Sequence, residues 1–574
     1  MTKSIISNSS VYNDMKVNEI LEKINLIDKN NYIQLIDEIL LDYQLLKEYE
    51  KYSKISIRKQ HGIYYTNFKL AYQITKEAMD GFNKEIINSK LLEPCVGLGV
   101  FVIAYLEYID KHCSLNEIEI KDVLSNIYIS DIDNLAIKLA KKLISKFIEV
   151  KFKIKYKIKN NNTYVGNVIY NDNKVHTVKS LFGENFKFDI VLTNPPYRNL
   201  KASSKEFNKE DYKEYQSYCK QVSKLIKKEL YLQQGTINLY KVFLELIYTR
   251  FSADESVIGV IIPSSLLSDH TSSSLRQYMI NNSKIKKIYL LNESSNEFNS
   301  ITQSMCYFGL KKNDISDNVE IIDVETDSEF KINLKNLRNI DSYSNLIKLT
   351  SNATSILNSI HKFPKIKDID DIHNLRGELD LTLNKKYISE KVTRYPLLQG
   401  KHVKEWNIKG DTKYVDNSFF EGKITPKKSF IYSERIICQQ ISNMSSNKRL
   451  KFSKINKNYV LGNSCNFIAV KNNIDLDYIL AILNSYLMDW RFKLFSSNNH
   501  INNYELNELP INLDNKYINE IIEYSKEIQN GNLNKIIELN KIVFKIYNIE
   551  KKHALEILDS YTDEYANLLK ESMV

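Results

Sequence analysis

Between residues 61 and 310, short apolar runs of strand length alternate with longer segments that have the apolar spacing of helices. Helices are expected at segments such as 134–148 and 238–251, and strands at 89–93, 127–131, 188–193, 257–262, 286–291 and 304–310. Because parallel strands need a crossover between them, this alternation predicts a largely parallel sheet covered by helices on both faces. The expected fold class of this segment is therefore α/β.

Two changes of pattern divide the rest of the chain, which at 574 residues is too long for a single core. Residues 15–52 repeat apolar groups at helical spacing and predict two helices, whereas residues 311–345 turn polar, as a domain boundary would. Irregular basic and aromatic segments follow, and then helices. The expected organisation is a helical extension over 1–60, an α/β domain over 61–335 and a mixed α+β domain over 336–574 that ends in helices.

Positive charge is concentrated in one part of the chain. The net charge is +10, and residues 391–460 hold 15 Lys and Arg against 5 Asp and Glu. Such a patch is typical of a surface that binds nucleic acid, although a solvated basic face has the same composition. The alternation of Lys with apolar residues in KFKIKYKIK, 151–159, is better explained by an edge strand protected by lysines than by a DNA contact.

Other features of the composition restrict the class of protein. The N-terminal segment MTKSIISNSSVYND has no apolar core after a basic start, so no signal peptide is expected, and no apolar run is long enough to span a membrane. The six cysteines are scattered without a C-x-x-C pair, which argues against a disulfide framework and a zinc site. We expect a cytoplasmic protein with reduced thiols, no metal and no membrane partner.

The segment LLEPCVGLGVF, 91–101, has the pattern of a strand followed by a glycine loop that leads into a helix. Gly97 and Gly99 let the backbone approach a ligand at the carboxyl end of the strand. The third glycine of the dinucleotide fingerprint is missing, and Glu93 precedes the loop. This acid disfavours a pyrophosphate and suits a cationic ligand such as an α-amino group. Alone the signal is weak, because G-x-G after a strand is common.

The next expected strand, in NIYISDID at 126–133, ends in two acids. A carboxylate at the end of this strand is where a ribose diol is usually bound, and Asp131 is the candidate. Asp133 stands at the start of the following helix, where Asp favours the N-cap position. We therefore predict a ligand contact for Asp131 and a capping role for Asp133.

The segment FDIVLTNPPY, 188–197, places Asn194, Pro195, Pro196 and Tyr197 at a strand end. Each proline fixes φ and lacks an N–H, so the turn is rigid. The Asn194 carboxamide and the carbonyl that precedes Pro196 present two acceptors, which match the two N–H donors of an exocyclic amino group. Accepting both hydrogens leaves the nitrogen lone pair available for attack, and Tyr197 adds a π face for a flat substrate. The alternative, a plain strand-terminating turn, is disfavoured by the glycine loop and Asp131 upstream.

Together these segments resemble the gamma-class N6-adenine DNA methyltransferases. The motifs follow the order of that family: GIYYTN (62–67), EPCVGLGVF (93–101), ISDID (129–133), FDIVLTNPPY (188–197), NLYKVFLE (238–245) and GVIIPSSLL (259–267). Weaker similarity to the recognition domains of type IIG restriction–modification enzymes continues through YPLLQGKHVKEW (395–406), ILAILNSYLMDW (479–490) and ELNELPI (505–511). The resemblance implies a Rossmann-like methyltransferase domain followed by a C-terminal target-recognition domain that binds double-stranded DNA.

The resemblance also implies S-adenosylmethionine as the cofactor. Two positions depart from the family pattern: Asn67 replaces the usual proline, and Asn167 stands where an aspartate often contacts the cofactor's adenine. The residues implied to bind the cofactor are Tyr65, Thr66, Glu93, Pro94, Gly97, Gly99, Asp131, Ile132 and Asn167.

The implied catalytic set is Asn194, Pro195 and Tyr197, with Phe298 as a second aromatic side chain against the target base. Because the target amino group lies inside a duplex, the enzyme would extrude the base, and stacking on Tyr197 and Phe298 would offset part of the cost of unpairing. Phosphate contacts are expected mostly on the 391–460 face. Candidates there are Lys401, Lys404, Arg435, Lys448 and Arg449.

The predicted function is site-specific adenine N6 methylation of DNA, without cleavage and open to partnership with a separate restriction endonuclease. Only about 60 residues precede the cofactor motifs, too few for the usual N-terminal nuclease domain of type IIG enzymes, and no PD…D/E-x-K cluster is evident there. The alternatives are a methyltransferase acting on RNA or protein glutamine, and a non-catalytic DNA-specificity subunit.

Overall fold

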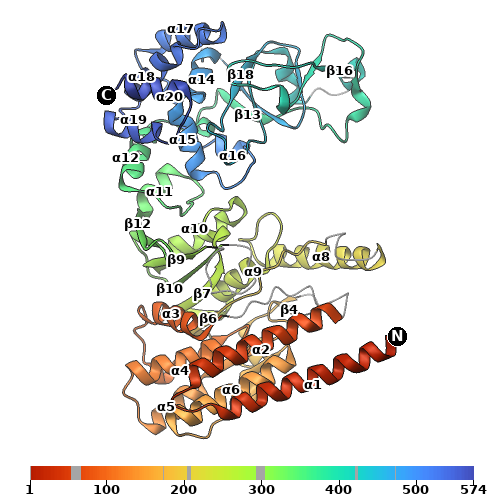
Figure 1. The fold of residues 1–574 in the computed structure, drawn as a ribbon, viewed down its shortest axis with the longest axis vertical. Helices are drawn as coiled ribbons and strands as arrows, with labels where there is room; N and C mark the ends of the chain where they lie inside the picture. Colours follow the sequence, from red (N-terminus) through yellow and green to blue (C-terminus); the bar gives the residue numbers. More distant parts are fainter. Residues whose placement is uncertain are drawn as a thin grey trace. The chain divides into compact units, whose positions relative to one another are not determined.

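The structure, a computed structural model, describes residues 2–53, 66–171, 174–202, 209–292, 304–420, 425–471 and 474–573. The chain folds into two compact units, which Figure 1 colours by sequence. The first contains Met1–Lys335 and Tyr343–Lys348, and the second contains Asn336–Ser342 and Leu349–Val574. Each unit has its own sheets and its own core.

The first unit is built on one mixed sheet. Its parallel part runs in the order β3 (Thr163–Val165), β2 (Ile127–Asp131), β1 (Leu91–Glu93), β6 (Phe188–Thr193) and β7 (Ser252–Pro263). The sheet continues through β10 (Met305–Lys312), β9 (Lys287–Leu291), β11 (Asn318–Asp323) and β12 (Ser328–Asn333). β10 is antiparallel to both β7 and β9, whereas β6 is parallel to β1 and β7. The predicted Rossmann-like α/β fold is confirmed.

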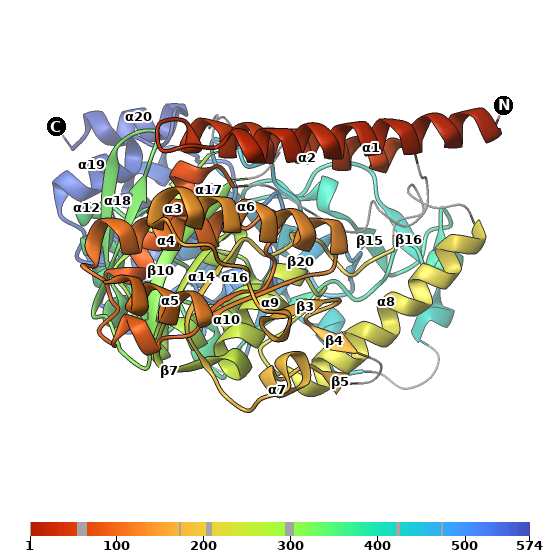
Figure 2. The same ribbon diagram turned by 90° about the horizontal axis from the view of Figure 1, so that it is seen from below.

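Helices cover both faces of this sheet (Figure 2). On one face lie α3 (Phe68–Met79), α4 (Val100–His112) and α6 (Asn134–Phe152), and on the other α9 (Leu239–Leu246) and α10 (Ser273–Asn282). α3 begins where the Asn67 side chain accepts a hydrogen bond of 2.8 Å from the Leu70 N–H. Asn67, which stands where the family usually has proline, therefore acts as a helix N-cap.

Two glycines let α3 approach the sheet. Gly259 on β7 and Gly309 on β10 are opposite each other in the antiparallel pair. A Cβ at position 309 would lie 2.4 Å from the Glu77 backbone, and one at 259 would lie 3.1 Å from the Ala78 side chain. Any side chain at 309 would therefore push α3 away from the sheet.

The two helices expected near 15–52 are α1 (Thr2–Leu26) and α2 (Tyr32–Ser53), which pack against each other (Figure 2). Polar contacts join α2 to two other helices of the first unit, α4 and α3. The Tyr32 hydroxyl donates to Glu107 on α4 at 2.9 Å, and the Phe68 N–H at the start of α3 donates to Asp37 at 2.7 Å. The helical pair is thus an integral part of this unit.

The edge strand predicted at 151–159 is wrong. α6 continues to Phe152, Lys153 ends it in the left-handed conformation at φ 60°, and residues 153–159 pair with no strand among the described residues. Ile154 and Ile158 are nevertheless buried, each 4 % exposed. The period-2 pattern therefore marks the burial of Ile154 and Ile158 between exposed residues rather than membership of a sheet.

The second unit contains two four-stranded sheets followed by helices. One sheet has the order β13 (Ile372–Arg376), β20 (Cys465–Val470), β17 (Arg435–Gln439) and β18 (Phe452–Ile455). The other has the order β14 (Ile388–Ser389), β16 (Lys413–Val415), β15 (Pro396–Leu398) and β19 (Val460–Leu461). The helices include α14 (Leu476–Leu483), α15 (Tyr486–Phe495), α17 (Ile518–Gln529) and α18 (Lys535–Ile546). The predicted mixed α+β class with terminal helices is confirmed.

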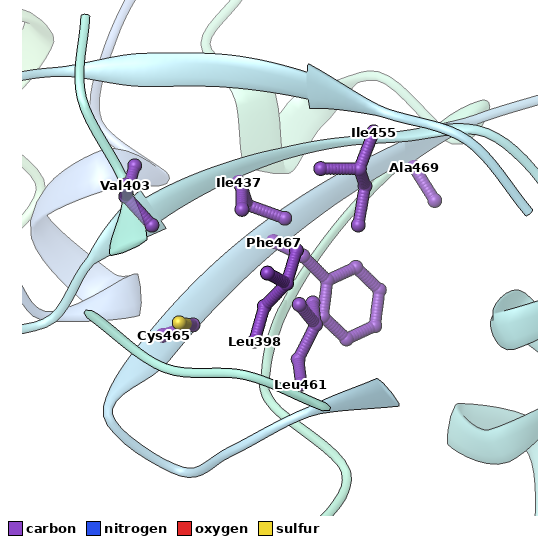
Figure 3. Packing of buried hydrophobic residues seen from close by; sticks show 8 residues of the cluster. All are labelled: Leu398, Val403, Ile437, Ile455, Leu461, Cys465, Phe467 and Ala469. Carbon is purple, nitrogen blue, oxygen red and sulfur yellow. The ribbon is translucent and has the colours of Figure 1, made fainter. Parts of the chain in front are cut away.

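Both sheets of the second unit contribute to a shared apolar cluster (Figure 3). The Phe467 ring of β20 lies beside Leu398 of β15 and Leu461 of β19, and each of these side chains is at most 1 % exposed. The remaining members of the cluster are Val403, Ile437, Ile455, Cys465 and Ala469. Burying aromatic and aliphatic side chains from two sheets in one cluster fixes the sheets against each other.

Candidate active site

The parallel strands of the first unit end at one edge of the sheet, and a cavity of about 190 Å³ lies there. Its walls come largely from segments that follow β1, β2, β3 and β6. This is where open α/β sheets bind their ligands. The structure brings to this cavity eight of the predicted site residues, namely Thr66, Glu93, Pro94, Gly97, Asp131, Ile132, Asn167 and Asn194.

The loop after β1 places a buried acid beside a helix terminus. Glu93 is 1 % exposed, and its carboxylate accepts a hydrogen bond of 3.2 Å from the Val102 N–H in the first turn of α4. Burial raises the pKa of Glu93 well above its ordinary value, and the nearby charge of Asp131 raises it further. Gly99 adopts φ 84° just before α4, where a Cβ would lie 2.7 Å from Ile144. Glycine at this position is therefore required for α4 to start where it does.

Asp131 joins the ends of β1 and β2. Its carboxylate accepts hydrogen bonds of 2.9 Å from the N–H groups of both Gly97 and Asp133. Burial raises the pKa of Asp131, against the opposing effect of these two hydrogen bonds. Asp133 accepts from the Leu135 N–H at 2.9 Å, so the predicted N-cap of α6 is confirmed.

The segment after β3 forms the side wall of the cavity. Asn167 accepts a hydrogen bond of 2.9 Å from the Ile169 N–H, which uses its carboxamide oxygen in a local turn. Asn167 also lines the cavity beside Tyr170. Ile132 also lines the cavity and is 49 % exposed, so it offers an apolar surface to a bound molecule.

Asn194 follows β6 and lines the cavity. Its Nδ2 donates a hydrogen bond of 3.0 Å to the Thr66 hydroxyl, and its Oδ1 accepts one from the Tyr197 hydroxyl. The Tyr197 hydroxyl also lies 3.0 Å from the carbonyl oxygen of Ile261. These contacts fix the plane of the carboxamide. Because a carbonyl oxygen has two lone pairs, Oδ1 can still accept a second donor.

The other predicted site residues either do not line the cavity or lie outside the described residues. Tyr197 is 9 % exposed, and neither it nor Pro195 is among the residues that line the cavity, whereas Pro196 is. Gly99 shapes the loop from behind, against Ile144. Tyr65 and Phe298 lie outside the described residues.

Sequence reasoning missed several side chains of the cavity. Leu40 and Tyr43 come from α2, and Tyr215 and Tyr218 come from α8 (Lys209–Glu229). The two α8 rings are stacked, with centroids 5.8 Å apart and an angle of 24° between their planes. Their i, i+3 spacing predicts that both rings share one face of the helix, but it does not place that face at the cavity. Nothing in the local sequence of α2 points to the cavity.

The charge of the cavity wall decides which ligands it suits. Three acids line the cavity, the buried Glu93 and the half-buried Asp131 and Asp133, whereas no Lys, Arg or His is among its lining residues in the described part of the chain. Such a wall disfavours phosphates and suits a ligand that is cationic at neutral pH. The tight Gly99 turn and the apolar side chains complete the wall of this site. The described residues contain no group of His, Cys, Asp and Glu that could hold a metal ion.

Burial corrects three of the predicted phosphate contacts. Arg435 is 0 % exposed and pairs with Glu378, Lys448 is 7 % exposed and pairs with Glu405, and Arg449 is 1 % exposed. A side chain without solvent exposure cannot reach a phosphate, so these predictions are wrong.

The Arg449 guanidinium donates to backbone carbonyls, including that of Asn498 at 2.7 Å. Of the five predicted contacts only Lys401 and Lys404 are exposed.

Comparison with known proteins finds two matched segments, one in each of the two units. Residues 125–298 match the Eco57I restriction-modification methylase family, and residues 395–511 match the TaqI-like C-terminal specificity domain. The Type II methyltransferase M.HincII of Haemophilus influenzae is 28 % identical over 148 residues, which cover 25 % of this chain and 26 % of that relative. The match thus spans about a quarter of the length of the curated relatives.

Solved structures share the fold. A nuclease-deletion mutant of the Type ISP restriction-modification enzyme LlaGI, in complex with a DNA substrate mimic, gives a TM-score of 0.51 at 12 % identity over 86 % of this chain and 48 % of that one. The ATP-dependent Type ISP enzyme LlaBIII bound to DNA gives 0.50 at 13 % identity over 86 % and 41 %. No helix of the described residues is both long and apolar enough to cross a bilayer. The predicted resemblance is confirmed: one segment of the chain is similar to the Eco57I restriction-modification methylases and another to the TaqI-like C-terminal specificity domain.

Proposed function

We propose that this protein is a site-specific DNA methyltransferase that transfers a methyl group from S-adenosylmethionine to N6 of adenine. The observation that carries the proposal is the position of Asn194. Its carboxamide lines the same cavity as Glu93 and Asp131, and its plane is fixed by Thr66 and Tyr197. A cavity that holds a cation-binding half and an oriented amide acceptor suits attack by an exocyclic amine on an activated methyl group.

The chain's own residues divide the work of the reaction. Glu93 attracts the α-amino group of the cofactor, Asp131 accepts from the ribose hydroxyls, and Ile132 and Asn167 contact the adenine. S-adenosylmethionine supplies a methyl group activated by its sulfonium.

Asn194 Oδ1 and the Pro195 carbonyl accept the two N6 hydrogens. This withdraws the nitrogen lone pair from the ring and stabilises the positive charge that develops on N6. After transfer N6 is positively charged and must lose one proton. That proton leaves to solvent along one of these two hydrogen bonds.

The target base must leave the duplex to reach Asn194. Tyr197 and Phe298 are the proposed stacking partners. The assignment of Phe298, which lies outside the described residues, follows from the family resemblance alone. For Tyr197, stacking requires that a base reach a ring that is now 9 % exposed.

Double-stranded DNA is the proposed substrate, and the second unit is proposed to recognise its sequence. Lys401 and Lys404 are exposed in the segment matched by the TaqI-like specificity domain, so they remain candidates for phosphate contacts. The proposed role is modification without cleavage, in the cytoplasm, which leaves any cleavage to a separate restriction endonuclease.

One experiment tests this function. Purified protein is offered labelled S-adenosylmethionine with DNA, RNA and total protein, and the labelled product is digested and identified. We expect N6-methyladenine in DNA, and Asn194→Ala should abolish its formation while leaving cofactor binding within about threefold. Label in RNA or on glutamine would replace the DNA assignment. If the parent protein binds no cofactor, the result would favour the alternative of a non-catalytic specificity subunit.

A further inference from the structure

The helical pair at the N-terminus reaches the cavity. Leu40 and Tyr43 of α2 line it together with Asp131 and Asp133, and both side chains are at most 3 % exposed. α2 lies outside every motif that predicted the site and outside the segment matched by the methylase family. The cavity therefore has a wall that no sequence feature assigned to it.

Two side chains of α2 converge on Asp133. The Tyr43 hydroxyl donates to Asp133 Oδ2 at 2.9 Å, and the Lys47 ammonium lies 2.5 Å from the same oxygen. The other oxygen, Oδ1, accepts from the Leu135 N–H and caps α6. Burial raises the pKa of Asp133, but the ion pair with Lys47 and the hydrogen bonds from Leu135 N–H and Tyr43 together leave the pKa below its ordinary value. Asp133 is therefore held as an anion by α2.

The contact between α2 and Asp133 is linked in turn to Asp131, the carboxylate proposed to bind the ligand. The backbone N–H of Asp133 donates to Asp131 Oδ1 at 2.9 Å, while Gly97 N–H donates to Asp131 Oδ2 at 2.9 Å. Lys47 thus acts on Asp133, and Asp133 fixes the orientation of the Asp131 carboxylate. A ligand hydroxyl that binds Asp131 meets a group whose position depends on α2.

α2 is held firmly enough for this role. Glu107, which accepts from Tyr32 of α2, also pairs with Lys111 and Lys151 at 2.9 Å each. At the other side, Asp37 of α2 accepts from Phe68 N–H at the start of α3. α3 is preceded by Thr66, the partner of Asn194. α2 therefore contacts the elements that carry both halves of the cavity.

We infer that α2 is part of the binding site for the nucleoside half of the cofactor: Leu40 and Tyr43 form a wall of that site, and Lys47 is a positioning residue that acts through Asp133 on Asp131. This inference rests on the proposed function, because the ligand it concerns is S-adenosylmethionine. A purely structural role of the ion pair would change the stability of the unit and leave ligand affinity untouched.

The chain provides a matched control. Lys23 of α1 pairs with Asp42 of α2 at 2.8 Å, within the same helical pair but with neither residue among those that line the cavity. Lys47→Met removes the ion pair with Asp133, and Lys23→Met removes those with Asp42 and Glu38. All these pairs are partly exposed, so each substitution should cost little stability. The conservative variants Lys47→Arg and Tyr43→Phe keep the charge and the ring.

The readout is the Kd of S-adenosylhomocysteine by calorimetry on the full chain, with thermal unfolding of the free protein measured beside it. We expect Lys47→Met to weaken binding about 3- to 10-fold, Lys47→Arg to restore most of it, and Lys23→Met to change it less than about twofold. Tyr43→Phe should fall between the parent and Lys47→Met, because it removes only the hydroxyl that donates to Asp133.

Equal affinity of Lys47→Met and the parent would overturn the inference while leaving the proposed function intact. Equal weakening by Lys47→Met and Lys23→Met would also overturn it, because the effect would then follow the stability of the helical pair. Failure of the parent itself to bind S-adenosylhomocysteine would overturn the proposed function and this inference together.

Discussion

Nδ2 of Asn194 donates a hydrogen bond of 3.0 Å to the hydroxyl of Thr66, which lies 128 residues earlier in the chain. Thr66 is 2 % exposed, so the hydroxyl that accepts this bond has little access to water. With Nδ2 bound in this way, Oδ1 must be the atom of the carboxamide that accepts from a substrate. Thr66 therefore selects which end of Asn194 is left for the amino group of the proposed substrate.

The first prediction follows from this contact. Thr66→Val keeps the size of the side chain and removes the oxygen that accepts from Asn194, so the carboxamide loses a fixed orientation. We expect the rate of methyl transfer in a single turnover to fall about tenfold, which is about 1.4 kcal/mol, with a smaller change in cofactor Kd. Thr66→Ser should restore most of the rate. A larger loss of affinity than of rate would show that Thr66 serves the cofactor instead.

The second prediction concerns Asp131. Asp131→Ala should weaken S-adenosylmethionine binding by about 1.5–3 kcal/mol, since charge-assisted hydrogen bonds to the ribose are removed. Asp131→Asn, which can still accept from Gly97 or Asp133, should lose less. If calorimetry finds the alanine variant as tight a binder as the parent, Asp131 only ties the loop after β1 to the end of β2.

The third prediction is a pH dependence set by Glu93. The raised pKa of this acid means that the free folded protein holds a proton that the unfolded chain releases near its ordinary value of 4.5. Its contribution to stability is therefore lost as the pH rises through the raised pKa. An ammonium group bound beside Glu93 favours the charged form, so binding releases the proton and affinity should rise with pH above 4.5. Calorimetry in buffers of different ionisation enthalpy measures this proton, and Glu93→Gln should remove it.

The fourth prediction concerns DNA affinity and salt. A variant with both Lys401 and Lys404 replaced by Gln should bind DNA with a weaker dependence on salt. The slope of log K against log salt concentration should become shallower by about 0.9 for each phosphate that these lysines neutralise in the parent. Lys526 and Lys541, exposed on α17 and α18, provide a control pair of equal charge. An unchanged slope in the first pair, or an equal change in both pairs, would count against phosphate binding by Lys401 and Lys404.

The fifth prediction assigns Arg435 to stability. Arg435 and Glu378 are both 0 % exposed, and Glu378 also accepts from the Leu461 N–H at 2.8 Å. Arg435→Met leaves a buried carboxylate without its partner, which should cost about 3–5 kcal/mol of unfolding free energy in the second unit. Denaturant unfolding of the full chain measures the loss. A variant with full stability and a shallower salt dependence of DNA binding would reinstate Arg435 as a phosphate contact.

Much of the first unit could be predicted because its strands are buried on both faces. β2 and β6 occupy the same residues that the apolar runs indicated, 127–131 and 188–193, and the acid or amide that ends each run lines the cavity. A parallel strand between two neighbours has to be continuously apolar, so its ends are sharp in the sequence. Asp133 was predictable for a local reason, since an N-cap needs only its own helix.

The features that could not be predicted depend on partners far away in the chain. The partner of Arg435 is Glu378, and that of Lys448 is Glu405; nothing in a count of charges separates such pairs from free cations. The contribution of Tyr43 to the cavity depends on where α2 packs, 90 residues before Asp133. Local pattern identifies the chemistry of the strand ends, but burial of charge and long-range packing are decided by the tertiary structure.

The facing glycines 259 and 309 have a consequence for how variation in this protein should be interpreted. α3 rests on this pair, and the residue that orients Asn194 stands two positions before α3 begins. Alanine at 309 would displace the helix and with it Thr66, so methylation should be abolished although no reacting group has changed. A saturation scan selected on methylation would rank this position with Asn194 itself. Intolerance to substitution in such a scan would thus mark backbone spacing as well as chemistry, and the two need a binding or stability assay to be told apart.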